Sequence, residues 1–160
     1  MTIQVGDKVP DIALTTMTAE GPAAVSSADL FGGKKVVIFA LPGAFTPTCS
    51  AKHLPGFIGN ADAFRAKGVD TVGCLSVNDA FVMGAWGVDQ NAGSDVVMLA
   101  DGSAQFSKAM GLELDLTDRG MGVRSQRYAM VVDDGTVTHL AVEAPGAFEV
   151  SSAESILSAL

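Results

Sequence analysis

Cysteine is scarce in this sequence, which contains only Cys49 and Cys74. A disulfide framework needs more cysteines than this, and a structural zinc site normally needs a closely spaced pair of ligands such as C-x-x-C. The two cysteines lie 25 positions apart and neither belongs to such a pair. The sequence therefore indicates neither a disulfide scaffold nor a zinc site, and each cysteine needs its own explanation.

Positive charge and long apolar segments are also scarce. The chain has 10 Lys and Arg against 18 Asp and Glu, a formal net charge of −8, and a field of this sign repels phosphate groups. We therefore expect no nucleic-acid partner and no anionic-membrane partner. Apolar runs such as Val36–Leu41 are far shorter than the ~20 residues of a membrane-spanning helix.

The overall composition predicts one compact domain, 1–160. A length of 160 residues suits a single domain, and a hydrophobic fraction of 48% leaves apolar area for a homodimer interface as well as a core. The first residues show no basic segment followed by an apolar stretch, so we expect no secretory signal and a cytoplasmic location.

Strand and helix patterns alternate along the chain. Continuous apolar runs rich in β-branched residues predict buried strands over Lys35–Leu41, Val69–Val77 and Asp95–Asp101. Helical patterns with caps or terminating glycines cover Asn60–Gly68, a segment that starts at Asn78 or Asp79, and Ser103–Gly111. Two strand-like runs around Asp134–Gly135 predict a hairpin. A capping box of Ser151 and Glu154 predicts a final helix.

This order of elements predicts the fold class. Strand and helix alternate three times, and a hairpin and a last helix follow. The parallel crossovers in front and the antiparallel pair behind are the order of thioredoxin-like folds. We therefore expect an α/β, thioredoxin-like sandwich with a central mixed β-sheet flanked by helices.

Cys49 follows the first of these strands, in the turn "LPGAFTPTC". Pro47 suits the first helical position, where the missing N–H costs nothing. Thr46 is then expected as the N-cap, with its hydroxyl accepting from the Cys49 backbone N–H. Free N–H groups and the helix dipole favour an anion in the first turn, and thiolates are stabilised there. The turn thus gives Cys49 a local reason to be a thiolate.

The turn also limits the chemistry of Cys49. Enzymes of the thioredoxin type carry C-x-x-C here, whereas this chain has Thr46 three residues before Cys49. A local dithiol cannot form, so we expect the chemistry of a single thiol. Attack of a thiolate on a peroxide O–O bond would give a sulfenic acid.

The segment "PGAFTPTCS" resembles the P-x-x-x-T-x-x-C motif of the peroxiredoxins, with Pro42, Thr46 and Cys49 at the motif positions. The segments "FALPGAFTPTCSAKHLPGF", "GCLSVNDAFVMGAW" and "GVRSQRYAMVVDDG" are similar to the Prx5 (type II) subfamily. The resemblance covers essentially the whole chain.

The resemblance implies a thiol peroxidase that reduces hydrogen peroxide and small alkyl hydroperoxides without metal, haem or flavin. By resemblance Cys49 attacks the peroxide, Thr46 hydrogen-bonds its oxygens, and Pro42 shields the thiolate. Arg124 takes the position of the catalytic arginine, whose fixed charge and rigid N–H fork would stabilise the departing oxygen.

Three further residues each have more than one possible role. His53 lies four positions after Cys49 and therefore on the same helix face; a surface or packing role is favoured over support of the thiolate. Arg127 is expected to form a structural ion pair or to line the pocket. The resemblance suggests that Phe45 contributes to a dimer interface or a pocket wall.

The route of recycling depends on a second thiol. Cys74 lies in the middle of a predicted strand and is favoured as a buried structural cysteine. Two-cysteine members of the subfamily carry a resolving cysteine near the C-terminus, where this chain has Ser151 and Ser152. The resemblance therefore implies recycling by glutathione and glutaredoxin. The alternative is a Cys49–Cys74 disulfide reduced by thioredoxin, which requires the Cys49 helix to unwind.

Other classes of function stay open on the sequence. A peroxide sensor or redox chaperone would use the same oxidation of Cys49 to change a binding surface. A thiol-disulfide oxidoreductase is disfavoured because C-x-x-C is missing. A purely structural module would make Cys49 matter for stability alone.

Overall fold

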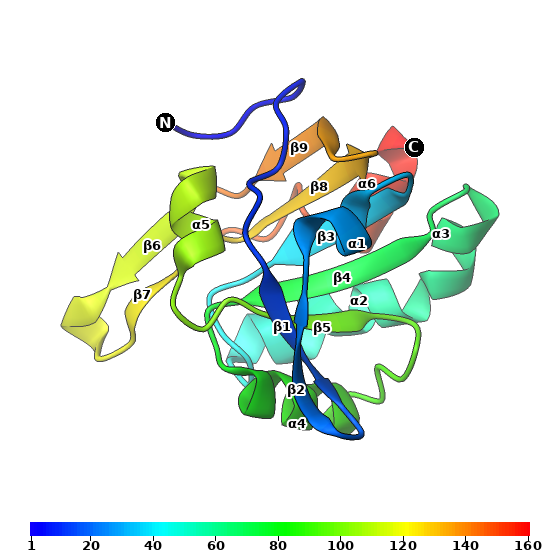
Figure 1. The fold of residues 1–160 in the computed structure, drawn as a ribbon. Coiled ribbons are helices and arrows are strands. Elements are labelled where there is room, and N and C mark those ends of the chain that lie inside the picture. Colours follow the sequence, from blue (N-terminus) through cyan, green and yellow to red (C-terminus); the bar gives the residue numbers. More distant parts are fainter.

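The computed structural model describes residues 1–160 and is built around a seven-stranded sheet (Figure 1). The strand order is β2-β1-β5-β4-β3-β8-β9. The strands are β1 (Leu14–Thr18), β2 (Gly21–Val25), β3 (Lys35–Ala40), β4 (Thr71–Ser76), β5 (Val97–Ala100), β8 (Tyr128–Asp133) and β9 (Thr136–Val142). The central strands β3, β4 and β5 are parallel, and every outer pair is antiparallel. The sheet is therefore mixed, as the sequence predicts.

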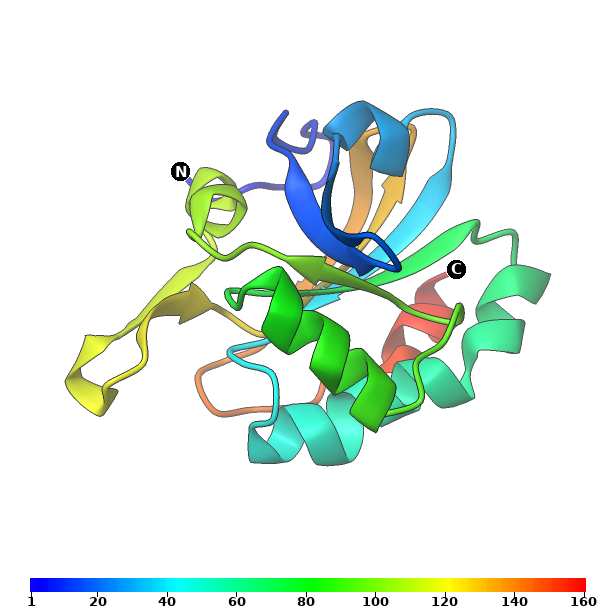
Figure 2. The same cartoon turned by 60° about the horizontal axis from the view of Figure 1, so that its bottom comes forward.

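Helices cover both faces of this sheet (Figure 2). They are α1 (Ser27–Phe31), α2 (Leu54–Gly59), α3 (Ala61–Ala66), α4 (Ala80–Asp89), α5 (Gln105–Met110) and α6 (Ala153–Ala159). Helices α2, α3, α4 and α6 pack on one face, whereas α1 and α5 pack on the other. None of them is long and apolar enough to cross a bilayer.

Strand β3 shows why its sequence is apolar without interruption. Val37 and Phe39 belong to the core on the α2 side, whereas Val36 and Ile38 belong to the core on the α1 side. Because successive side chains of a strand point to opposite faces, a strand covered on both faces needs apolar residues at every position. This confirms the predicted sandwich of a central mixed sheet between helices.

Two hairpins lie outside the predicted order of elements. The β1–β2 hairpin extends one edge of the sheet. Strands β6 (Glu113–Leu116) and β7 (Gly122–Ser125) form a separate two-stranded sheet, joined by a 3₁₀ turn at Thr117–Arg119, that projects from one side of the molecule (Figure 1). Strand β6 alternates between exposed and half-buried residues, and β7 is half-buried except for the buried Ser125. Neither strand carries the apolar run that marks a buried strand.

The predicted hairpin is present as β8 and β9. Asp134 and Gly135 both have positive φ, at 47° and 80°, as a two-residue turn with the right twist requires. Strand β8 also pairs with β3, and its first residue, Tyr128, lies opposite Ala40, the last residue of β3. Arg127, the residue before Tyr128, therefore lies next to the turn that follows Ala40. This pairing of strands brings together the residues of the candidate site.

The final helix begins one residue later than the capping box predicts. The cap of α6 is Ser152, whose Oγ accepts from the Ser155 N–H at 3.2 Å. Ser151 is buried instead, and its Oγ donates to a Glu143 carboxylate oxygen at 2.7 Å. A buried carboxylate needs donors, so Ser151 is used there and the cap moves to the next serine.

Candidate active site

The turn after β3 holds Cys49 at the start of a helical segment. The helical conformation begins at Pro47, as predicted, and the Thr46 carbonyl accepts from the Ser50 N–H at 2.9 Å. The prediction that the Thr46 hydroxyl accepts from the Cys49 N–H is wrong. That hydroxyl instead donates to the Gly43 carbonyl at 2.6 Å, because the turn places this carbonyl within hydrogen-bonding distance.

Cys49 opens a π-helical turn that spans Cys49–His53. The Leu54 N–H donates to the Cys49 carbonyl, five residues back, which is the bond that defines a π-helix. Such wide turns are rare and occur frequently at functional sites. The Trp86 indole N–H donates to the Ser50 Oγ at 3.1 Å and ties this turn to α4.

Arg127 is the residue whose guanidinium contacts the Cys49 sulfur. Its Nη2 lies 3.1 Å from the Sγ of Cys49, and its Nη1 lies 2.8 Å from the Nδ1 of His53. Both salt bridges of the structure belong to Arg65, so no carboxylate forms an ion pair with Arg127. Its positive charge is available to an anionic sulfur, in a chain that is otherwise acidic.

Arg124 does not occupy the place that the sequence assigns to it. Its Nε donates to the Met121 carbonyl at 2.8 Å, and its Nη1 donates to the Pro42 carbonyl at 3.4 Å. The physical reason is strand register: Arg124 lies in the separate β7, whereas Arg127 immediately precedes Tyr128, which pairs with the end of β3. Arg124 therefore braces the turn from outside, and the contact with sulfur belongs to Arg127.

The turn between β3 and Cys49 is held tightly around Pro42 and Gly43. A Cβ on Gly43 would lie 3.0 Å from the Arg124 Nη1 and 3.1 Å from a Thr46 methyl carbon. The Ala44 N–H donates to the Asn78 side-chain oxygen at 3.0 Å. Pro42 is half-buried at the start of this turn. The turn is therefore held by Arg124 at the Pro42 carbonyl and by Asn78 at the Ala44 N–H.

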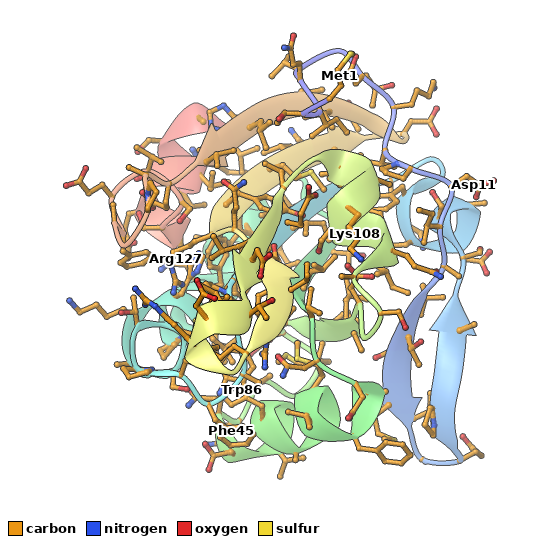
Figure 3. All side chains as sticks on the ribbon, turned by 90° about the vertical axis from the view of Figure 1, so that its left-hand side faces the viewer. Met1, Asp11, Phe45, Trp86, Lys108 and Arg127 are labelled. Carbon is orange, nitrogen blue, oxygen red and sulfur yellow. The ribbon has the colours of Figure 1, made fainter.

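Phe45 stands at the exposed end of the same turn. Its φ is 62°, a conformation that is unusual and strained for a bulky residue. The side chain is 54% exposed, and its ring lies 6.3 Å from that of Trp86 (Figure 3). The turn therefore directs an aromatic ring outward, beside α4.

His53 is completely buried and is not a surface histidine. Its Nε2 lies 2.9 Å from the Ser151 carbonyl oxygen, and its Nδ1 faces Arg127. Burial, with the charge of Arg127 as a second cause, lowers the pKa of His53 to about 3, although the Ser151 bond and Glu143 act in the other direction. His53 is therefore neutral at physiological pH.

Cys74 is a fully buried thiol in β4. It lies opposite Phe39 of β3 and Met98 of β5, in the middle of the sheet. Burial raises the pKa of Cys74 well above its ordinary value, and the nearby Cys49 raises it further. Both cysteines are free thiols, and no three His, Cys, Asp or Glu side chains are grouped to hold a metal ion.

Comparisons with known proteins agree with this geometry. The chain matches the Redoxin family over residues 4–157. It is 54% identical to rice (Oryza sativa subsp. japonica) chloroplastic peroxiredoxin-2E-2, covering 99% of this chain and 73% of the rice protein. It is 50% identical to Arabidopsis thaliana peroxiredoxin-2B, covering 99% and 98%.

A solved structure extends the likeness to the fold. Reduced Prx3 of Vibrio vulnificus, in complex with hydrogen peroxide, superposes with a TM-score of 0.95 at 57% identity and covers 99% of both chains. The thioredoxin-like fold expected from the order of elements is thereby confirmed. Taken with the thiol and guanidinium of the Cys49 turn, these matches show that the chain belongs to the peroxiredoxin family of thiol peroxidases.

Proposed function

We propose that this protein reduces hydrogen peroxide and small alkyl hydroperoxides through a sulfenic acid on Cys49. The observation that carries this proposal is the 3.1 Å contact between the Cys49 sulfur and the unneutralised guanidinium of Arg127. A permanently charged donor at this distance stabilises a thiolate. It is also available to the negative charge that develops on the peroxide during the reaction.

The reaction requires no cofactor. The Cys49 thiolate attacks one peroxide oxygen, the S–O bond forms as the O–O bond breaks, and the second oxygen leaves as hydroxide or alkoxide. Uptake of a proton from water gives water or an alcohol, and Cys49 becomes a sulfenic acid. Sulfur is oxidised by two electrons and the peroxide is reduced by two.

The residues around Cys49 divide the remaining tasks. Arg127 holds the sulfur and the departing oxygen together. The Thr46 hydroxyl proton is engaged by Gly43, so its lone pairs are free to accept from the peroxide O–H. Pro42 shields the thiolate, and Arg124 keeps the turn in place through the Pro42 carbonyl.

Burial of Cys49 favours small substrates. The residue is only 1% exposed, so a peroxide has to enter a confined space beside the turn. Hydrogen peroxide and short alkyl hydroperoxides fit such a space, whereas a bulky lipid hydroperoxide would have to displace the turn.

For recycling we favour glutathione with glutaredoxin. Cys74 lies at the centre of the sheet, and Ser151 and Ser152 are held by Glu143 and by the α6 cap. The only other thiol of this chain is therefore held within the sheet, out of contact with solvent. An external thiol would form a mixed disulfide with Cys49, and a second thiol would release it. The alternative route is a Cys49–Cys74 disulfide that thioredoxin reduces.

Peroxide consumption by the purified protein tests both levels of this proposal. We expect turnover with glutathione and glutaredoxin, no turnover in Cys49→Ser, and undiminished turnover in Cys74→Ser. Turnover with thioredoxin that is lost in Cys74→Ser would replace the proposed reductant with the disulfide route. Absence of turnover with either system, together with oxidation-dependent binding of a partner, would favour a peroxide sensor.

We also propose a homodimer that uses the α4 side of the molecule. Phe45, Phe81 and Val88 are 54%, 66% and 80% exposed there, and clustered exposed apolar groups mark interaction surfaces. Sedimentation should show a dimer at micromolar concentration that Phe81→Glu disrupts. Val5→Glu, at an exposed apolar residue of another segment, is the matched control and should leave the dimer intact.

A cytoplasmic location stays a prediction. Relatives at 50% and 54% identity include proteins named as chloroplastic, so the family alone does not decide the compartment.

A further inference from the structure

We propose that His53 is a positioning residue for peroxide reduction: its neutral imidazole accepts a hydrogen bond from Arg127 and thereby aims the guanidinium at the Cys49 sulfur. This inference rests on the proposed function, because it concerns the rate at which Cys49 reacts with peroxide. His53 itself makes no hydrogen bond to Cys49, so it acts through Arg127 alone.

The partners of His53 determine which nitrogen carries the proton. A guanidinium can only donate, so the Nδ1 that faces the Arg127 Nη1 at 2.8 Å has to be an acceptor. A carbonyl can only accept, so the Nε2 that faces the Ser151 oxygen at 2.9 Å has to carry the hydrogen. Both contacts are satisfied by one species, the neutral Nε2–H tautomer. Protonation of Nδ1 would break the bond to Arg127.

The C-terminal segment fixes this tautomer. One carboxylate oxygen of Glu143 accepts from the backbone N–H groups of Glu149, Val150 and Ser151 at 2.8–2.9 Å, and from the Ser151 Oγ. These bonds close the loop after β9 and hold the Ser151 carbonyl against His53. The Glu143 N–H donates to the Arg127 carbonyl at 2.9 Å. The start of the loop is therefore hydrogen-bonded to the backbone of Arg127.

Aromatic rings surround the contact between His53 and Arg127. The imidazole lies 5.0 Å from the ring of Phe39, 5.6 Å from that of Phe57 and 5.0 Å from that of Phe148. The Arg127 guanidinium lies 5.8 Å from the centre of the Phe148 ring, within reach of a cation–π contact. The rings and the burial of His53 therefore cover the imidazole side of the Nδ1–Nη1 hydrogen bond, and a lower local dielectric strengthens such a bond.

The arrangement excludes a role for His53 as a general base, for two reasons. Its Nδ1 lone pair is occupied by Arg127 and its Nε2 proton by Ser151, so it has no free atom to remove a proton from Cys49. Because its pKa is lowered to about 3 by burial and by the charge of Arg127, it is also a weak base at neutral pH. The remaining role of His53 is to hold the Nη1 of Arg127 while the Nη2 contacts the Cys49 sulfur.

The first test is a double-mutant cycle on the rate constant for oxidation of reduced Cys49 by hydrogen peroxide. The ring of His53→Phe fills the same aromatic surroundings without an acceptor, whereas the amide oxygen of His53→Gln restores one. We expect His53→Phe to lower the rate by ~10–100-fold, the range for loss of a group that orients a reacting one, and His53→Gln to recover part of it. In the Arg127→Met background, His53→Phe should have little further effect.

Three results would overturn the inference: a rate for His53→Phe within about twofold of the wild type, equal rates for His53→Phe and His53→Gln, or losses that multiply in the double variant. The wild-type rate in the same assay separates this failure from failure of the proposed function, in which Cys49 of the wild type would itself be inert.

A second measurement needs no substitution of His53. The chain has two histidines, His53 and His139, so ¹⁵N NMR of histidine-labelled protein, with His139→Gln for assignment, reports the tautomer of His53 directly. We expect a neutral Nε2–H tautomer that persists down to about pH 5. An imidazolium or an Nδ1–H tautomer at neutral pH would contradict the inference, even if His53→Phe failed to fold.

Discussion

Cys49 and Cys74 have nearly the same burial and belong to the same apolar cluster, yet their surroundings differ in kind. Cys49 is 1% exposed and Cys74 is 0% exposed. Cys49 lies at the start of a helical segment, with the Arg127 guanidinium 3.1 Å from its sulfur. Cys74 lies within a strand among apolar side chains, where burial raises the pKa of its thiol.

The difference shows that burial by itself does not decide the fate of a cysteine. An apolar environment disfavours the thiolate, and Cys74 experiences that effect without an effective counterpart. Cys49 has a permanent positive charge within hydrogen-bonding distance, which no carboxylate neutralises. Strand register places a cationic donor beside one of the two buried thiols and not the other, and this is the basis for proposing Cys49 as the reactive cysteine.

The largest effect is expected when Cys49 loses its cationic partner. Arg127→Met removes the donor and should lower the rate constant for oxidation of Cys49 by hydrogen peroxide by ~10²–10³-fold, the range for loss of one transition-state donor. Arg124→Met removes a brace of the Pro42 carbonyl and should cost less than ~10-fold. Stopped-flow kinetics on both variants decide between the two arginines, and a larger loss in Arg124→Met would contradict the assignment.

Cys74 should matter for stability and not for rate. Cys74→Ser places a hydroxyl without a hydrogen-bond partner in the sheet core. This substitution should lower the free energy of unfolding by about 1–3 kcal/mol. Cys74→Ala, which introduces no polar group, is the control. Denaturant unfolding measures the cost, and peroxide kinetics should be unchanged in both variants. A rate that falls in both would make Cys74 part of the chemistry.

The effect that is smallest near neutral pH, and grows only on acidification, is a dependence of stability on pH that His53 carries. The pKa of His53 is lowered from its ordinary value of 6.5 to about 3 by burial first and by Arg127 second. The unfolded chain therefore binds a proton that the folded chain does not, between these two values. Stability from neutral His53 is present above pH 6.5 and is lost as the pH falls toward 3, with a slope of up to about 1.4 kcal/mol per pH unit.

Unfolding of the wild type and of His53→Phe at several pH values checks this expectation. The variant has no imidazole to titrate, so its free energy of unfolding should fall less steeply between pH 6.5 and 4. The carboxylate of Glu143 keeps its donors from Glu149, Val150 and Ser151 in both proteins, so the difference between the two slopes reports chiefly on His53. Equal slopes would show that His53 is not held neutral by the fold.

Much of the fold is predictable from local sequence patterns. Strands β3, β4 and β5 carry uninterrupted apolar runs because both of their faces are covered, and Asp134–Gly135 specifies its own turn. The β6–β7 hairpin lacks such a signal, because all of its strand residues except Ser125 are half-buried or exposed. Its existence depends on long-range pairing that no local pattern records.

The candidate site likewise has a part that local sequence predicts and a part that depends on long-range pairing. The turn that holds Pro42, Thr46 and Cys49 is contiguous in sequence, so its residues could be recognised together. Arg127 and His53 meet only because β8 pairs with β3 and the loop after β9 folds back. Choosing Arg127 over Arg124 requires the pairing of Tyr128 with Ala40. The hairpin predicted around Asp134–Gly135 was the only sequence signal near Arg127, and it did not specify which strand it would pair with.

The most direct test of the account is the intact mass of the reduced protein after brief exposure to a small excess of hydrogen peroxide. We predict one added oxygen in the wild type and in Cys74→Ser, and none in Cys49→Ser, because only Cys49 has a cation beside its sulfur. A wild type that gains no oxygen and loses no hydrogens, or a Cys49→Ser protein that still gains oxygen at Cys74, would contradict it.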